Sequence, residues 1–156
     1  MPVKQESALQ IELMNDSRIV ALPGKEETIR GYSGVNLLVV DEASRVKDAL
    51  YYSVRPMLAV SGGRLIALST PFGKRGFFFK EWEEGSDDWQ RTKITALDVP
   101  RISAEFLEEE RAALGDWWWR QEYMCEFVET NDQVFSYDLI QEAMSGDVQP
   151  LFGGLG

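Results

Sequence analysis

The sequence predicts an α/β fold, and three observations carry that prediction. Residues 37–40 and 64–68 are short aliphatic runs, LLVV and RLIAL, of the kind found in parallel strands buried on both faces. Between them, four apolar residues recur at helical spacing: Val46, Leu50, Val54 and Met57. This spacing predicts a helix that links the two strands. A hairpin precedes them, and the order strand, helix, strand favours a parallel sheet covered by helices.

The hairpin occupies the start of the chain. Within residues 8–14, apolar and polar side chains alternate from Leu9 to Leu13, as in a half-buried strand. The turn-forming sequence Asn-Asp-Ser follows, and residues 18–22 return as a second strand. A Pro-Gly pair ends the hairpin, and residues 25–30 are expected to form a short helical turn.

The later elements follow from breakers and caps. Pro56 is expected to end or kink the helix that links the strands. Next come an aromatic helix over residues 77–82 and a strand over residues 89–95. Ser103 is the predicted N-cap of a helix over residues 104–114.

The C-terminal part of the chain is predicted to be helical. Gly115 stops the preceding helix, and Asp116 caps another that runs to about Glu126. The tail from Asn131 contains a short helical stretch. The aromatic side chains of this half are predicted to lie in the core rather than to stack on bases, because duplex DNA does not expose its bases; they are Phe77, Phe78, Phe79, Trp82, Trp117, Trp118, Trp119 and Tyr123.

Composition excludes several classes of protein. The 156 residues suffice for about one domain and contain no apolar stretch near the ~20 residues that span a bilayer, so we expect a cytosolic protein. A single cysteine and no histidine exclude an internal disulfide, a Ser-His-Asp triad and a histidine-ligated zinc site. Any metal must therefore be held by oxygen ligands, which favours Mg²⁺.

Charge is distributed unevenly. Residues 1–80 carry 11 basic and 8 acidic side chains, whereas residues 81–156 carry 5 basic and 18 acidic. A contact with nucleic acid is therefore expected in the first half, because the second half repels phosphate. The alternative is that the acidic half is simply a well-solvated surface.

Two adjacent acids follow the first aliphatic run. Asp41 and Glu42 stand where the predicted strand at residues 37–40 ends, and ligands bind at the carboxyl ends of strands in open α/β sheets. This layout is that of a Walker B element, in which Asp41 would serve Mg²⁺ and Glu42 would polarise a water against a nucleotide γ-phosphate. The alternative is a central strand whose polar residues merely begin the next loop.

Polar residues also follow the second aliphatic run. Ser69 and Thr70 stand at its end, where their hydroxyls could sense the γ-phosphate or Glu42; alternatively they satisfy the local backbone of a turn. Lys74 and Arg75 are flanked by glycines and could approach a DNA backbone or a nucleotide, or form a solvated turn.

Three blocks of sequence, in this order, resemble the large subunit of tailed-phage terminases, which are DNA-packaging motors. The blocks are GYSGVNLLVVDEASRV, RPMLAVSGGRLIALSTPFGKRGFFFKEW and WWWRQEYMCEFVET. The resemblance covers residues from about Ile11 to Tyr137 and the later part of the family's ATPase domain. It implies a partial P-loop NTPase sheet of the ASCE type, with Walker B and coupling-motif strands, followed by a small helical lid subdomain.

The resemblance also assigns roles by position. Asp41 would be the Walker B metal acid and Glu42 the catalytic glutamate. Ser69-Thr70-Pro71 would be the coupling motif that links hydrolysis to movement. Arg30 matches a position where some members carry an arginine finger, although a surface arginine that caps a helical turn is the alternative. In this scheme residues 1–100 belong to the ATPase core, 101–130 to the lid, and 131–156 lead into a nuclease domain.

The resemblance implies a wider set of partners. ATP and Mg²⁺ would be the cofactors of the completed protein, and double-stranded DNA its cargo. The portal, the small terminase subunit and a ring of identical subunits would be its protein partners in the host cytoplasm, with no membrane involved.

Parts of the family pattern are missing. The sequence contains no GxxxxGK[ST] motif: around Lys74, the position of the first glycine is occupied by Leu68. It also contains no cluster of acidic residues like that of the family's nuclease domain. We therefore expect a middle piece of a terminase that is marginally stable or self-associating, inactive alone and completed by an upstream Walker A polypeptide. The alternatives are a non-catalytic prophage remnant, inert or protein-binding, and a helicase-like translocase.

Overall fold

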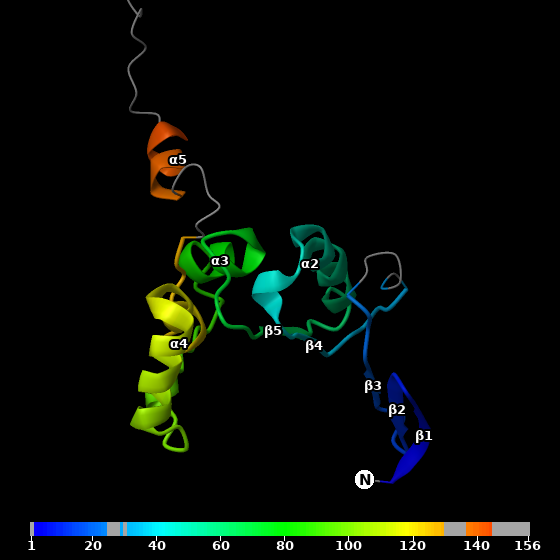
Figure 1. Ribbon diagram of the computed structural model, residues 1–156. Helices are drawn as coiled ribbons and strands as arrows, with labels where there is room; N and C mark the ends of the chain where they lie inside the picture. Colours follow the sequence, from blue (N-terminus) through cyan, green and yellow to red (C-terminus); the bar gives the residue numbers. More distant parts are fainter. Residues whose placement is uncertain (1, 25–28, 30, 130–136, 145–156) are drawn as a thin grey trace, which may run out of the picture. The chain divides into compact units, whose positions relative to one another are not determined.

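The computed structural model describes residues 2–24, 29, 31–129 and 137–144. The chain is a mixed α/β protein that divides into two compact units, residues 1–68 and residues 69–156. Figure 1 shows the elements of each unit in the colours of the sequence. Among the described residues, no helix combines the length and the apolar character needed to cross a lipid bilayer.

The first unit begins with a three-stranded antiparallel sheet. Its strands are β1 (Val3–Ser7), β2 (Gln10–Leu13) and β3 (Arg18–Val20), paired in the order β1-β2-β3. The predicted hairpin is confirmed as β2–β3, and its turn includes Asp16 in the left-handed conformation with φ 63°. Both strands are shorter than predicted, and β1 was not predicted. Of the predicted helical turn at residues 25–30, only Ile29 lies within the described residues, and it is helical.

A parallel strand pair with a helical crossover completes this unit. Strand β4 (Leu37–Val40) pairs in parallel with β5 (Arg64–Ala67), with Leu37 opposite Arg64 and Val40 opposite Ala67. The crossover contains η1 (Ala43–Arg45), α2 (Asp48–Val54) and η2 (Arg55–Leu58). As predicted, the α-helix stops before Pro56, which lies in the first turn of η2 because proline cannot donate a helical hydrogen bond.

The core of the first unit lies on one side of the parallel pair. Ile29, Val54 and Met57 are each at most 5% exposed, and Leu22, Val35, Leu38 and Leu50 pack against them. On the other side of the strands, Leu37 is 47% exposed, Val39 52% and Ile66 47%. The expectation that β4 and β5 are buried on both faces is therefore wrong for the described chain, because helical segments cover only the side that Leu38 faces.

The second unit is helical in its described part. It contains α3 (Gly76–Glu83), η3 (Ala96–Asp98), α4 (Ala104–Glu122) and α5 (Tyr137–Met144). The predicted aromatic helix is confirmed as α3, whose Phe77 and Phe79 are 2% and 4% exposed. The ring of Phe127 packs edge-on against Phe79 with centroids 5.1 Å apart. Phe77 and Phe79, two of the three phenylalanines of α3, thus lie in the core of this unit, as predicted.

The predicted strand over residues 89–95 is wrong. These residues have no regular secondary structure, and Ile94 is 62% exposed. The segment is held instead by side-chain bonds, since the Arg91 guanidinium donates to the carbonyls of Glu81 and Gly85 at 2.7 Å each. A β-propensity pattern without a neighbouring strand has no ladder to join, which is why propensity alone failed here.

Helix α4 keeps the predicted cap and break. The Ser103 hydroxyl accepts from the Phe106 N–H at 3.2 Å, which confirms the N-cap. Gly115 has φ 80° and ψ 161°, so it kinks the helix at the predicted stop. The second half ends at Glu122 rather than near residue 126, and the core prediction is wrong for Trp118, which is 42% exposed. The helical stretch predicted in the tail corresponds to α5.

Candidate functional site

The two acids that follow β4 form a tight turn. Glu42 adopts the left-handed conformation, with φ 50° and ψ 40°, and its N–H donates to Asp41 Oδ1 at 3.0 Å. The Glu42 carbonyl accepts from the Arg45 N–H at 2.9 Å and so opens η1. A glutamate in this region costs about 1–3 kcal/mol, and such conformations cluster at functional sites.

The turn is fixed to the end of β5. Ala43 is completely buried, and its N–H donates to the Leu68 carbonyl at 3.1 Å, while the Leu68 N–H donates to the Val40 carbonyl at 3.0 Å. These two bonds extend the parallel ladder past the strands and fix the backbone on either side of the two acids. The geometry of the Glu42 turn is thus set by the exit of the neighbouring strand.

The acidic side chains themselves point into solvent. Asp41 is exposed, and the Glu42 side chain is 66% exposed with Oε2 3.8 Å from Arg45 Nε. Within the described ranges there is no group of three acidic, cysteine or histidine side chains placed to hold a metal. The donor set fits Mg²⁺ held jointly with a phosphate ligand, because Mg²⁺ commonly takes one or two carboxylates and completes its shell with phosphate oxygens and water.

The predicted coupling residues lie at the start of the second unit. The Thr70 hydroxyl donates to Glu122 Oε2 at 2.9 Å, and Pro71 is buried. Ser69 is half-buried. The structure therefore ties Thr70 to the C-terminal end of α4.

Both cations of the predicted contact have partners. Lys74 Nζ lies 3.9 Å from Glu129 Oε1, and its side chain is 26% exposed. The Arg75 guanidinium carbon lies 4.7 Å from the centre of the Phe72 ring, the geometry of a cation–π contact. Their contact with DNA or nucleotide stays a prediction.

Two site residues remain: one lies outside the described residues, and the other was not predicted from the sequence. Arg30 lies outside the described residues, so its predicted role stays a prediction. Glu122 was not singled out from the sequence, although it accepts from both Thr70 and Gln121. The local sequence carried no signal for Glu122, because its partner Thr70 is 52 positions away.

Comparisons with known proteins agree with this architecture. Residues 3–142 match the family described as "Terminase large subunit, T4likevirus-type, N-terminal". The terminase large subunit of Escherichia phage T5 is 31% identical over 135 residues, covering 81% of this chain and 30% of that protein. The terminase large subunit of Thermus phage G20c is 26% identical over 129 residues, covering 72% and 26%. The chain thus spans less than a third of the length of these relatives.

The fold is also similar to a solved structure. The large terminase ATPase domain of Thermus phage P74-26 superposes with a TM-score of 0.59 at 21% identity, covering 81% of this chain and 57% of that one. A mutant of the same domain gives a TM-score of 0.60 at 20% identity. With the family match over residues 3–142, these likenesses lead to one conclusion: the chain belongs to the T4likevirus-type family of terminase large subunits and corresponds to part of the family's N-terminal region.

Proposed function

We propose that this chain is the hydrolysis and coupling segment of an ATP-driven motor that moves double-stranded DNA into a phage procapsid. The observation that carries the proposal is the Asp41-Glu42 turn, placed at the carboxyl end of a parallel strand and bonded through Ala43 to the end of β5. Membership of the terminase large-subunit family supports the same activity. The alternative, a non-catalytic remnant, is an outcome of the test below.

The two acids divide the chemistry between them. Asp41 would hold Mg²⁺ together with ATP, whose phosphate charge the metal neutralises when bound. Glu42 would accept a hydrogen bond from the attacking water and take up its proton as a general base. The exposure of the Glu42 side chain supports this division, because it leaves room for a water at the carboxylate.

Hydrolysis would be passed on through the segment that follows β5. Ser69-Thr70-Pro71 would act as the coupling motif, and the bond from Thr70 to Glu122 supports this role because it connects the segment to α4. In this proposal residues 1–100 form the later part of the ATPase core, and residues 101–130, which include α4, form its lid. Residues 131–156 would lead toward a nuclease domain.

The proposed partners follow from the family. Lys74 and Arg75 would contact DNA or nucleotide phosphates by exchanging their present partners for phosphate oxygens. Arg30 would reach the γ-phosphate of a neighbouring subunit in a ring of identical subunits, where such a residue is worth about 10³–10⁵ in rate. Portal and small terminase subunit would complete the motor in the host cytoplasm, and a P-loop segment would supply the phosphate cradle that the sequence lacks.

The test is Mg²⁺-dependent ATP hydrolysis. It is measured on the chain alone and on the chain joined to a P-loop-bearing terminase segment, which we call the completed protein. We expect no hydrolysis by the chain alone and hydrolysis by the completed protein. Glu42→Gln should lower kcat of the completed protein by about 10²-fold or more, because the water loses its base, while nucleotide still binds.

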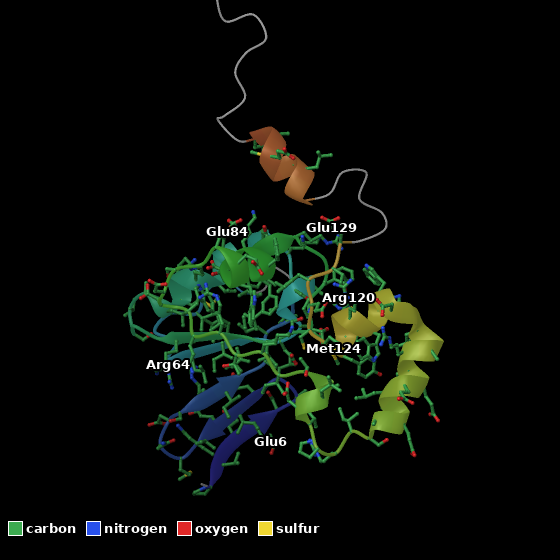
Figure 2. The ribbon with its side chains drawn as sticks, turned by 90° about the vertical axis from the view of Figure 1, so that its left-hand side faces the viewer. Glu6, Arg64, Glu84, Arg120, Met124 and Glu129 are labelled. Carbon is green, nitrogen blue, oxygen red and sulfur yellow. The ribbon has the colours of Figure 1, made fainter. Side chains whose placement is uncertain are left out.

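A matched control isolates the role of Glu42. Glu6→Gln makes the same change on β1, where the side chain is exposed and labelled in Figure 2, and it should leave the rate unchanged. A completed protein that binds no nucleotide would favour the non-catalytic remnant. Equal rates for Glu42→Gln and Glu6→Gln would refute the role of Glu42.

A further inference from the structure

Both carboxylate oxygens of Glu122 are occupied by donors. Oε2 accepts from the Thr70 hydroxyl at 2.9 Å, and Oε1 accepts from the Gln121 side-chain amide at 3.1 Å. Thr70 and Glu122 are 52 positions apart in the sequence, so this bond is a tertiary link rather than a feature of local structure. It joins the segment after β5 to the last turn of α4; Figure 2 labels Arg120 in this turn and Met124 just after the helix.

The surroundings of this link are largely shielded from water. Gln121 has no exposed surface, and Met124 is 8% exposed. Pro71, next to Thr70, is also buried. A hydrogen bond to a charged oxygen is roughly twice as strong as one between neutral groups, and shielding strengthens it further. The orientation of the Thr70 hydroxyl is therefore strongly determined by Glu122.

The chemistry of the two groups fixes the direction of the bond. A carboxylate can only accept, so the Thr70 hydroxyl must be the donor. A hydroxyl has a single proton, and while that proton points at Glu122 the Thr70 oxygen can act toward any other group only as an acceptor. Thr70 in this state can receive a hydrogen bond from a water or an N–H, but it cannot donate to a phosphate oxygen.

We propose that Glu122 is a positioning residue that holds the Thr70 hydroxyl in its acceptor state and thereby couples the segment after β5 to α4. This role rests on the proposed function, because it gives the coupling motif its link to the rest of the second unit. A phosphate oxygen that recruits the Thr70 proton must break the bond to Glu122 and so remove this link to the end of α4. The single Thr70 proton can be donated either to Glu122 or to a phosphate oxygen. The bond to a nucleotide phosphate and the bond to α4 therefore exclude each other.

The test uses ATP hydrolysis by the completed protein with Thr70→Val, Glu122→Gln and the double variant. Valine keeps the shape of Thr70 without the hydroxyl. Glutamine can still accept from Gln121 through its carbonyl oxygen, but its amide can only donate to the Thr70 oxygen, so the Thr70 proton is no longer held. We expect each single variant to lower kcat about tenfold with KM unchanged within about twofold, and the double variant to be no slower than the slower single variant.

Controls separate positioning from general damage. Glu126→Gln removes a carboxylate that pairs with Arg120 at 2.7 Å, close to the same helix end, and should leave kcat unchanged. Thr70→Ser keeps the hydroxyl, so its kcat should be close to that of the wild-type completed protein and above that of Thr70→Val. If Glu122→Gln does not fold, as judged by the near-ultraviolet signal of the tryptophans, Glu122→Asp replaces it, because aspartate keeps both acceptors but withdraws them by one methylene.

The outcomes are distinct. Additive losses in the double variant, about a hundredfold together, would overturn the role of Glu122. So would equal rates for Glu122→Gln and Glu126→Gln, or a change confined to KM. Absence of hydrolysis by the completed wild-type protein would instead overturn the proposed function and this role with it, so the two failures cannot be confused.

Discussion

A methyl group added at Gly63 tests the geometry that places the acidic turn. Gly63 lies just before β5, and its N–H donates to the Leu58 carbonyl at 3.2 Å. An added Cβ would lie 2.0 Å from the Val35 carbonyl oxygen, 3.0 Å from that of Asn36 and 2.9 Å from Leu58 Cδ2. Two of these three atoms belong to the backbone that leads into β4, so the clash cannot be relieved by a side-chain rotation.

The expected loss of stability follows from what must move. Separating the Cβ from the Val35 oxygen requires a shift of about 1 Å, larger than the tolerance of a hydrogen bond. The Gly63 bond to Leu58 and the bond from the Arg64 N–H to the Asn36 carbonyl, now 2.9 Å, would then weaken or break. Two such bonds at about 1 kcal/mol each, with about 1–3 kcal/mol for overpacking, give about 3–5 kcal/mol. This corresponds to a fall of about 6–20 °C in Tm.

The assay is thermal unfolding of the chain, monitored by circular dichroism, with two other glycine-to-alanine variants as controls. Gly24→Ala has nothing within 4 Å of the new Cβ and should leave Tm unchanged. Gly62→Ala also enters open space, but at φ +60° it should cost about 1–2 kcal/mol from backbone strain alone. A Gly63→Ala protein that melts within about 2 °C of Gly24→Ala would refute the packing argument.

Three further predictions concern the second unit. The hydrogen bond from Tyr123 to Glu110 at 2.7 Å, together with burial, raises the pKa of Tyr123. The stabilisation that this bond gives the folded chain should therefore be complete below pH ~10 and lost as the pH rises through the raised pKa. The unfolding free energies of the wild-type chain and of Tyr123→Phe, measured between about pH 8 and 11, should converge only at the upper end of this pH range. Ser103→Ala should cost about 1 kcal/mol in denaturant unfolding, because the Phe106 N–H loses its cap, and a loss below about 0.3 kcal/mol would contradict this. Burial raises the pKa of the Cys125 thiol, so iodoacetamide at pH 8 should modify it at least about tenfold more slowly in the folded chain than in urea, and equal rates would show it to be accessible.

The elements that carry the acids could be predicted because their patterns are local. The LLVV run at residues 37–40 and the apolar spacing up to Met57 each fit one type of secondary structure, and the structure contains both. Three residues act through their own local chemistry, so their roles could be predicted from the sequence alone: Pro56 ends a helix, Ser103 caps one and Gly115 kinks one. The family resemblance is confirmed by the match over residues 3–142.

What could not be predicted depends on contacts with other segments of the chain. Strand β1 is made of exposed residues with little apolar signal, and only its pairing with β2 defines it. Residues 89–95 carry β-forming side chains but have no strand beside them. The link between Thr70 and Glu122 joins positions 52 apart, and no spacing rule connects a hydroxyl to a carboxylate at that separation. The left-handed Glu42 is equally invisible to propensity, because the fold imposes it.

The bond between Ala43 and Leu68 also sets an order of folding. The antiparallel strands β1, β2 and β3 are neighbours in sequence and can pair within microseconds of being made. The parallel pairing of β4 with β5 must wait for the whole crossover, since parallel strands cannot be joined by a short turn. The Ala43 N–H donates to Leu68, which is synthesised after the whole crossover. We therefore expect the acidic turn to reach its final geometry only after Leu68 has left the ribosome. A chain interrupted before that residue would present both carboxylates without the frame that orients them.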